Sequence, residues 1–119
     1  MNPAKSVVLV VEDDPLILIH SRIALEDAGY EVIAAADGEA ALTEVAGRDD
    51  LAALFTDIEL PGAVDGVSLA AAVRRAHPDA SIVVTSGKHA PGEGELPERG
   101  RFVAKPYTAA QMHRALAAE

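Results

Sequence analysis

Short apolar runs alternate along this chain with segments whose apolar residues recur at helical spacing. A near-continuous apolar run such as SVVLVV at 6–11 is typical of a strand buried on both faces of a sheet. By the same reasoning, four further strands are predicted, at 30–36, 51–56, 81–86 and 101–105.

The first predicted helix follows Asp14, because an aspartate N-cap with Pro15 at the first helical position is a common start. Gly29 is predicted to end it. Its buried face is predicted to consist of Leu16, Ile19, Ile23 and the neighbouring Leu25. Later helices are predicted at 39–46, opened by Asp37-Gly38, at 66–78 and at 108–119.

This alternation of strands and helices predicts one α/β domain over residues 1–119, with a doubly wound, five-stranded parallel sheet. The expected strand order is 2-1-3-4-5. One segment departs from the alternation. GKHAPGEGELPERG at 87–100 contains four Gly and two Pro, so we expect a loop, or one short turn, where a fourth helix belongs.

The expected strand order brings the carboxyl ends of the first and third strands side by side. Glu12, Asp13 and Asp14 follow the first strand, and Asp57 follows the third. Converging carboxylates raise one another's pKa, and Mg²⁺, which prefers oxygen ligands, relieves the conflict. Glu12, Asp13 and Asp57 therefore predict a magnesium site, with the backbone carbonyl of Glu59 as a further ligand. The alternative is that Asp13 and Asp14 cap the helix while Asp57 begins a turn.

Ser86 and Lys105 end the fourth and fifth predicted strands at the same edge of the sheet. The alternative for Lys105 is an ordinary exposed lysine at a strand end. Together, a metal, a carboxylate, a hydroxyl and an ammonium suit phosphoryl transfer, because cations neutralise the phosphoryl oxygens and the hydroxyl hydrogen-bonds them. In that chemistry Asp57 is the nucleophile and the product is an aspartyl phosphate.

Composition excludes several other functions. The chain has no Cys, which rules out disulfides and thiolate chemistry. A net charge of −9 opposes nucleic-acid binding, and a composition of two Phe, two Tyr and no Trp argues against a base-stacking surface. No apolar stretch approaches the ~20 residues of a membrane span. We expect no membrane partner and a cytoplasmic location.

The motifs VLVVEDDP, FTDIELPG, VVTSG and VAKPY, in this order, resemble the receiver domain of two-component response regulators over residues 5–118. The single-domain chemotaxis regulator is the nearest architectural relative. The resemblance implies a flavodoxin-like fold and a phosphoryl group received from a histidine kinase or a histidine phosphotransfer protein. It also implies that Glu12 and Asp13 hold Mg²⁺, Asp57 is phosphorylated, Ser86 turns toward the phosphate, and Lys105 precedes a cis proline.

Further positions take roles from the same resemblance. Phe102 matches an aromatic residue that rotates inward on activation, and Thr85 is the competing hydroxyl to Ser86. Glu59 and Lys88 match side chains that tune dephosphorylation, and they are expected to pair with each other. The chain departs from the family pattern in a longer loop before Asp65-Gly66 and in the 87–100 segment, which replaces the fourth helix of the family's usual output surface.

Three functions remain to be compared. The first is a phosphoacceptor switch that catalyses only its own phosphorylation and dephosphorylation. The second is a phosphorylation-independent interaction domain of the same fold, which the intact acceptor set argues against. The third, a small enzyme or ligand binder, is disfavoured by the acidic loop after the first strand and the lack of a Gly-rich fingerprint. The start at Met1 predicts that nothing precedes the domain, which is a stand-alone regulator or a receiver from a longer chain.

Overall fold

The computed structural model describes residues 6–88, 90–92 and 94–117. Within these residues, strands and helices alternate as predicted, with bounds that agree with the expected ones to within two residues. The elements are β1 (Val7–Val11), α1 (Pro15–Asp27), β2 (Glu31–Ala35), α2 (Gly38–Gly47), β3 (Leu51–Asp57), α3 (Gly66–Ala76), β4 (Ser81–Ser86), β5 (Gly100–Ala104) and α4 (Ala109–Ala117).

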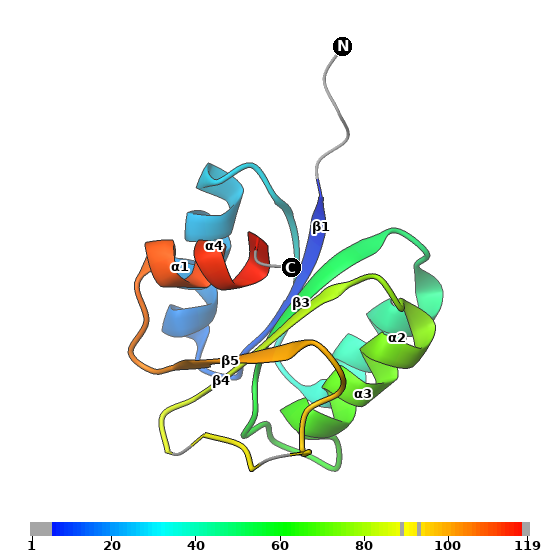
Figure 1. Ribbon diagram of the computed structural model, residues 1–119. Helices are drawn as coiled ribbons and strands as arrows, with labels where there is room; N and C mark the ends of the chain where they lie inside the picture. The colour runs from blue at the N-terminus through cyan, green and yellow to red at the C-terminus, as the bar shows by residue number, and fades with distance from the viewer. Residues whose placement is uncertain (1–5, 89, 93, 118–119) are drawn as a thin grey trace.

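The strands form one parallel sheet in the order β2-β1-β3-β4-β5, which confirms the predicted doubly wound topology. Helices α1 and α4 cover one face, and α2 and α3 cover the other (Figure 1). The core accordingly has two halves. The core half under α2 and α3 includes Leu9, Leu54 and Val84 of the sheet and Leu69 of α3. The core half under α1 and α4 includes Val8 and Phe55 of the sheet, Leu25 of α1 and Met112 of α4.

Helix α1 begins and ends where the sequence predicts. The Asp14 side chain accepts hydrogen bonds from the amides of Leu16 and Ile17, and Gly29 follows the helix with a φ of 100°. That positive φ is a left-handed conformation in which glycine has no side chain to clash. Among the described helices, none is long and apolar enough to cross a membrane.

The predicted buried face of α1 is wrong for three of its four residues. Leu16, Ile19 and Ile23 are 78%, 55% and 54% exposed, and only Leu25 is buried. The helix instead turns Ser21 inward, where its hydroxyl lies 2.8 Å from the Tyr107 hydroxyl. A buried polar group is tolerated when it is hydrogen-bonded. Because Ser21 is polar, a search for apolar residues at helical spacing does not identify it as buried.

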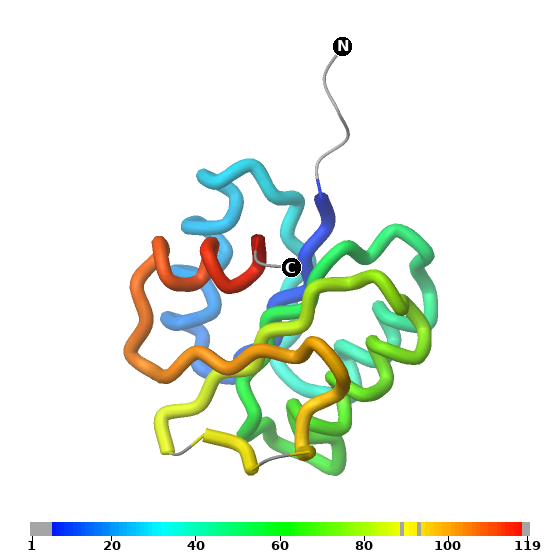
Figure 2. Tube along the Cα trace, in the orientation of Figure 1, coloured from blue at the N-terminus to red at the C-terminus, as the bar shows by residue number. Residues whose placement is uncertain are grey.

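The segment between β4 and β5 contains no helix in its described residues, as its Gly and Pro content predicts (Figure 2). Leu96 packs against the core half under α2 and α3. Arg74 of α3 donates hydrogen bonds to the backbone carbonyls of Glu98, Pro78 and Ala80. The contacts of Leu96 and Glu98 hold the end of the segment on the face of the sheet that α2 and α3 cover.

Candidate functional site

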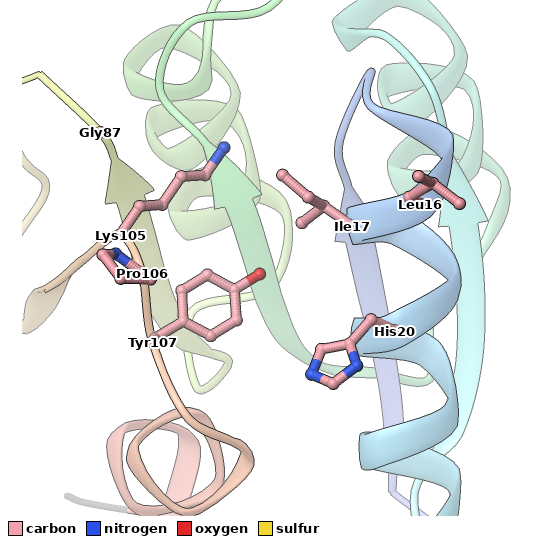
Figure 3. Close-up of a pocket in the computed structure, with 7 residues that line it drawn as sticks. All are labelled: Leu16, Ile17, His20, Gly87, Lys105, Pro106 and Tyr107. Atoms are coloured by element: carbon pink, nitrogen blue, oxygen red, sulfur yellow. The ribbon is translucent and has the colours of Figure 1, made fainter.

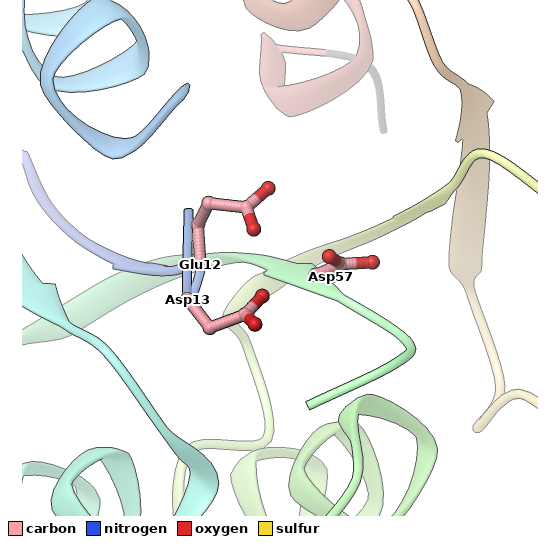
Figure 4. A group of neighbouring side chains, drawn as sticks. All are labelled: Glu12, Asp13 and Asp57. Carbon is pink, nitrogen blue, oxygen red and sulfur yellow. The ribbon is translucent and has the colours of Figure 1, made fainter. Parts of the chain in front are cut away.

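Three carboxylates meet at the carboxyl edge of the sheet (Figure 4). Val11 of β1 pairs with Thr56 of β3, so the residues that follow them, Glu12 and Asp57, are neighbours. One carboxylate oxygen from each of Glu12, Asp13 and Asp57 lies within 4.8 Å of the other two. The strand order thus brings these residues together as expected, while their roles as ligands stay a prediction.

Burial gives the three carboxylates different surroundings. Glu12 and Asp57 are only 4% and 5% exposed, whereas Asp13 is open to solvent. The Oδ1 atom of Asp57 is buried and has no hydrogen-bond partner among the described residues. Buried polar oxygens normally have a partner, and a hard cation with oxygen ligands fits this one. The donor set therefore fits Mg²⁺.

Lys105 provides the positive charge within this cluster. Its Nζ donates to Glu12 Oε1 at 2.8 Å and to Asp57 Oδ2 at 2.9 Å. Burial disfavours the ammonium, but the hydrogen bonds to Glu12 and Asp57 outweigh it and raise the pKa of Lys105. The lysine is therefore charged at neutral pH, and the alternative of an exposed strand-end lysine is wrong. The peptide bond from Lys105 to Pro106 is cis, as the resemblance implies.

Glu12 is held from two sides. Its Oε2 accepts a hydrogen bond of 3.1 Å from the Asp14 amide, while its Oε1 faces Lys105. Burial raises the pKa of Glu12, although these two donors favour the carboxylate. Asp14 itself caps α1, so the helix-capping alternative holds for Asp14, whereas Asp13 joins the carboxylate cluster.

The Ser86 hydroxyl is hydrogen-bonded to the Glu59 carboxylate. Ser86 Oγ donates to Glu59 Oε1 at 2.8 Å and accepts from the Lys88 amide at 3.0 Å. The expected ion pair between Glu59 and Lys88 is wrong within the described residues, because the Glu59 carboxylate bonds the hydroxyl instead. Thr85, which pairs with Asp57 across the strands, has a buried hydroxyl with no partner among these residues.

Phe102 lies in β5, opposite Val84 of β4. Its ring is partly buried and packs, like Leu96, against the core half under α2 and α3. Phe102 therefore lies on the strand beside β4, two residues before Ala104, which pairs with Ser86. Its role as a residue that rotates on activation stays a prediction.

An apolar cavity of about 550 Å³ lies beside the carboxylate cluster, between α1 and the chain after β5 (Figure 3). Sequence reasoning misses it, because it assigns Leu16 to the core and gives Tyr107, the last residue of the VAKPY motif, no role. The lining residues are Leu16, Ile17, His20, Gly87, Lys105, Pro106 and Tyr107. Lys105 therefore contacts both the cavity and the carboxylates.

Comparison with known proteins gives one consistent result. The family model described as response regulator receiver domain matches residues 8–117. The nitrogen assimilation regulatory protein NtrX of Azorhizobium caulinodans is 36% identical over 110 residues, which are 88% of this chain and 24% of that protein. The chain spans less than half the length of the curated relatives it matches.

Solved structures agree with that match. A response regulator receiver protein from Sinorhizobium medicae has a TM-score of 0.89 and 28% identity, covering 95% of this chain and 92% of that one. The receiver domain of a sensor histidine kinase from Pseudomonas aeruginosa, whose structure has a magnesium ion coordinated in the active site cleft, has a TM-score of 0.78 and 27% identity, covering 95% of each chain.

Proposed function

The chain belongs to the response regulator receiver domain family of two-component systems, and on this premise we propose that it is a phosphoacceptor switch whose nucleophile is Asp57. The observation that carries the proposal is the Asp57 carboxylate at the carboxyl end of β3, held on one oxygen by the Lys105 ammonium. A cytoplasmic location is part of this proposal and rests on the family alone.

In the proposed reaction an Asp57 carboxylate oxygen attacks the phosphorus of a phosphohistidine. The phosphorus–nitrogen bond breaks, the electron pair stays on the imidazole nitrogen, and an aspartyl phosphate forms. Lys105 holds Oδ2, which leaves Oδ1 without a protein hydrogen bond among the described residues. Lys105 also neutralises charge that the phosphoryl group adds. Ser86 then turns to donate to a phosphoryl oxygen, and Phe102 moves toward the space it leaves.

The experiment that tests this function is incubation with acetyl phosphate and Mg²⁺, followed by intact-protein mass spectrometry. A phosphoacceptor gains the mass of one phosphoryl group. The alternative, a phosphorylation-independent interaction domain, gains none.

Mg²⁺ is the proposed cofactor, and Glu12, Asp13 and Asp57 would hold it, with the Glu59 carbonyl as a further ligand. When bound, the ion supplies charge that stabilises the phosphoryl oxygens in the transition state. Asp13 is the exposed member of the set, so its removal is expected to disturb the fold least.

We therefore predict that Mg²⁺ raises the melting temperature of the protein. Binding to the folded state alone contributes about 1.4 kcal/mol at ten times the dissociation constant, or roughly 5 °C for a domain of this size. In Asp13→Asn the rise is expected to vanish, measured by thermal unfolding with Mg²⁺ and with EDTA. An equal rise in both proteins contradicts a metal site at Asp13.

The proposed donor is a histidine kinase or a histidine phosphotransfer protein, and α1 offers it a surface. Leu16, Ile19 and Ile23 are the large apolar side chains exposed among the described residues, and all three lie on this helix. Leu16 also lines the cavity beside Lys105. Exposed apolar patches with polar surroundings mark protein–protein contacts, so we propose that the donor docks along α1.

Ile19→Lys is expected to separate protein donors from small ones. Transfer from a phosphorylated donor, found by profiling purified histidine kinases, is expected to fall about tenfold or more, since a lysine here disrupts an apolar contact. Labelling by acetyl phosphate is expected to stay unchanged, because Ile19 is exposed on α1 and the carboxylates are held by Lys105 and the Asp14 amide. Ala46→Lys, which introduces a lysine at an exposed position of α2, is the matched control. Equal transfer to Ile19→Lys and to the control contradicts docking on α1.

A further inference from the structure

The Ser86 hydroxyl has one proton and already has an acceptor for it. Ser86 is 2% exposed, and its Oγ donates to Glu59 Oε1 at 2.8 Å. The same oxygen accepts from the Lys88 amide at 3.0 Å, so the hydroxyl is held as both donor and acceptor. A serine hydroxyl donates only one hydrogen bond at a time.

A phosphoryl group on Asp57 would offer new acceptor oxygens to that same proton. We propose that Glu59 is a positioning residue that restrains the unphosphorylated state, because its carboxylate competes with the phosphoryl group for the single proton of Ser86. This inference rests on the proposed function of Asp57. Phosphorylation then transfers the Ser86 hydrogen bond from the Glu59 carboxylate to the phosphoryl group. The equilibrium between these two states of Ser86 depends on how strongly Glu59 holds the hydroxyl.

The loop that presents Glu59 is fixed by contacts that do not involve the Glu59 side chain. Behind Asp57, the Ile58 amide donates to the Thr85 carbonyl at 2.9 Å, and the Ile58 carbonyl accepts from the Gly66 amide at 2.8 Å. Farther along, the Ala63 amide donates to Glu39 of α2 at 3.1 Å. Glu59 is thus presented to Ser86 by a loop anchored at several points.

Two properties make the Glu59–Ser86 bond a strong competitor. Its acceptor is ionised, and hydrogen bonds to ionised groups are about twice as strong as neutral ones. Its donor is buried, so Ser86 has no ready exchange with water when the bond is broken. Solvent exposure of Glu59 moderates the effect.

The test is a double-mutant cycle between positions 59 and 86 with beryllofluoride and Mg²⁺, beryllofluoride standing in for the phosphoryl group. Wild type, Glu59→Gln, Ser86→Ala and the double variant are titrated while backbone amide NMR signals are followed. Glu59→Gln is expected to lower the half-saturating beryllofluoride concentration about three- to tenfold, since a neutral acceptor competes less well. Glu59→Ala is expected to lower it at least as far. In the Ser86→Ala background, Glu59→Gln is expected to have no effect.

Two results of this titration overturn the inference. One is an unchanged half-saturating concentration in both Glu59 variants. The other is a shift of equal size in the Ser86→Ala background, which would mean that the Glu59 charge acts on the bound anion directly.

Urea unfolding of the same four proteins without ligand tests the Glu59–Ser86 hydrogen bond independently of whether Asp57 accepts a phosphoryl group. The hydrogen bond predicts a coupling between the two substitutions in the ligand-free protein. Its absence overturns the inference alone. If wild type and all variants fail to bind beryllofluoride, the proposed function of Asp57 fails, whatever the coupling.

Discussion

Asp57→Asn is expected to lower phosphorylation by acetyl phosphate about 100-fold or more, to the background of the assay, because an amide is no substitute for a carboxylate nucleophile. The fold is expected to survive, because asparagine has nearly the same shape and the Asp57 Oδ2 position can still accept from Lys105. Intact-protein mass spectrometry measures the labelling, and circular dichroism measures the fold.

Asp49→Asn is the matched control for this substitution. Asp49 precedes β3 and is exposed at the opposite end of the strand from Asp57. It is expected to label like wild type. Labelling of Asp57→Asn at the wild-type rate would show that another side chain is the acceptor, and the proposed function of Asp57 would be withdrawn.

Lys105→Met is expected to lower the free energy of unfolding by about 2–4 kcal/mol in the absence of Mg²⁺, measured by urea denaturation. The methionine keeps much of the side-chain volume but leaves the carboxylates of Glu12 and Asp57 without the ammonium they share. Buried charges that lose their partner are strongly destabilising, and partial exposure of Lys105, at 21%, moderates the loss.

The pH dependence of this variant follows from the same charges. Burial already raises the pKa of Glu12, and removal of the ammonium raises it further. The folded variant then binds protons that the unfolded chain does not, so its stability is expected to increase as the pH falls from neutral toward 4.5, the ordinary pKa of a glutamate. The loss of unfolding free energy in Lys105→Met is therefore expected to be largest at high pH.

Two additions test the reason for the defect. Glu12→Gln in the Lys105→Met background removes one of the two unpaired charges and is expected to restore part of the lost stability. Mg²⁺ is expected to stabilise Lys105→Met more than wild type, since it replaces the missing positive charge. If Lys105→Met unfolds at the wild-type urea concentration, the Lys105 contacts do not determine the stability of this site.

The sequence predicts those parts of the fold that depend on repeated patterns. Continuous apolar runs indicate buried strands, and their alternation with helices indicates a parallel sheet, whose order places Glu12 beside Asp57. Strand β5 also ends at the carboxyl edge of the sheet, and Lys105, which follows it, contacts both carboxylates from there. Only the strand order is needed for these inferences.

Single side-chain choices are where sequence reasoning fails. The inward face of α1 was misassigned because the buried residue Ser21 is polar, and its partner Tyr107 is 86 residues away. The resemblance suggests a pair between Glu59 and Lys88, yet the Glu59 carboxylate accepts from the buried hydroxyl of Ser86, which needs a partner. Which of two donors a carboxylate accepts from depends on three-dimensional positions that no periodicity encodes.

The contacts that complete the carboxylate cluster join residues far apart along the chain. Lys105 is 93 residues from Glu12 and 48 from Asp57. In folding, contacts of this kind form late, because long stretches of chain must first be brought together against loop-closure entropy. A chain still being synthesised has Asp57 before it has Lys105. Asp57, the proposed nucleophile, therefore meets the Lys105 ammonium only once β5 has joined the sheet, so the proposed reactivity would be acquired together with the finished fold.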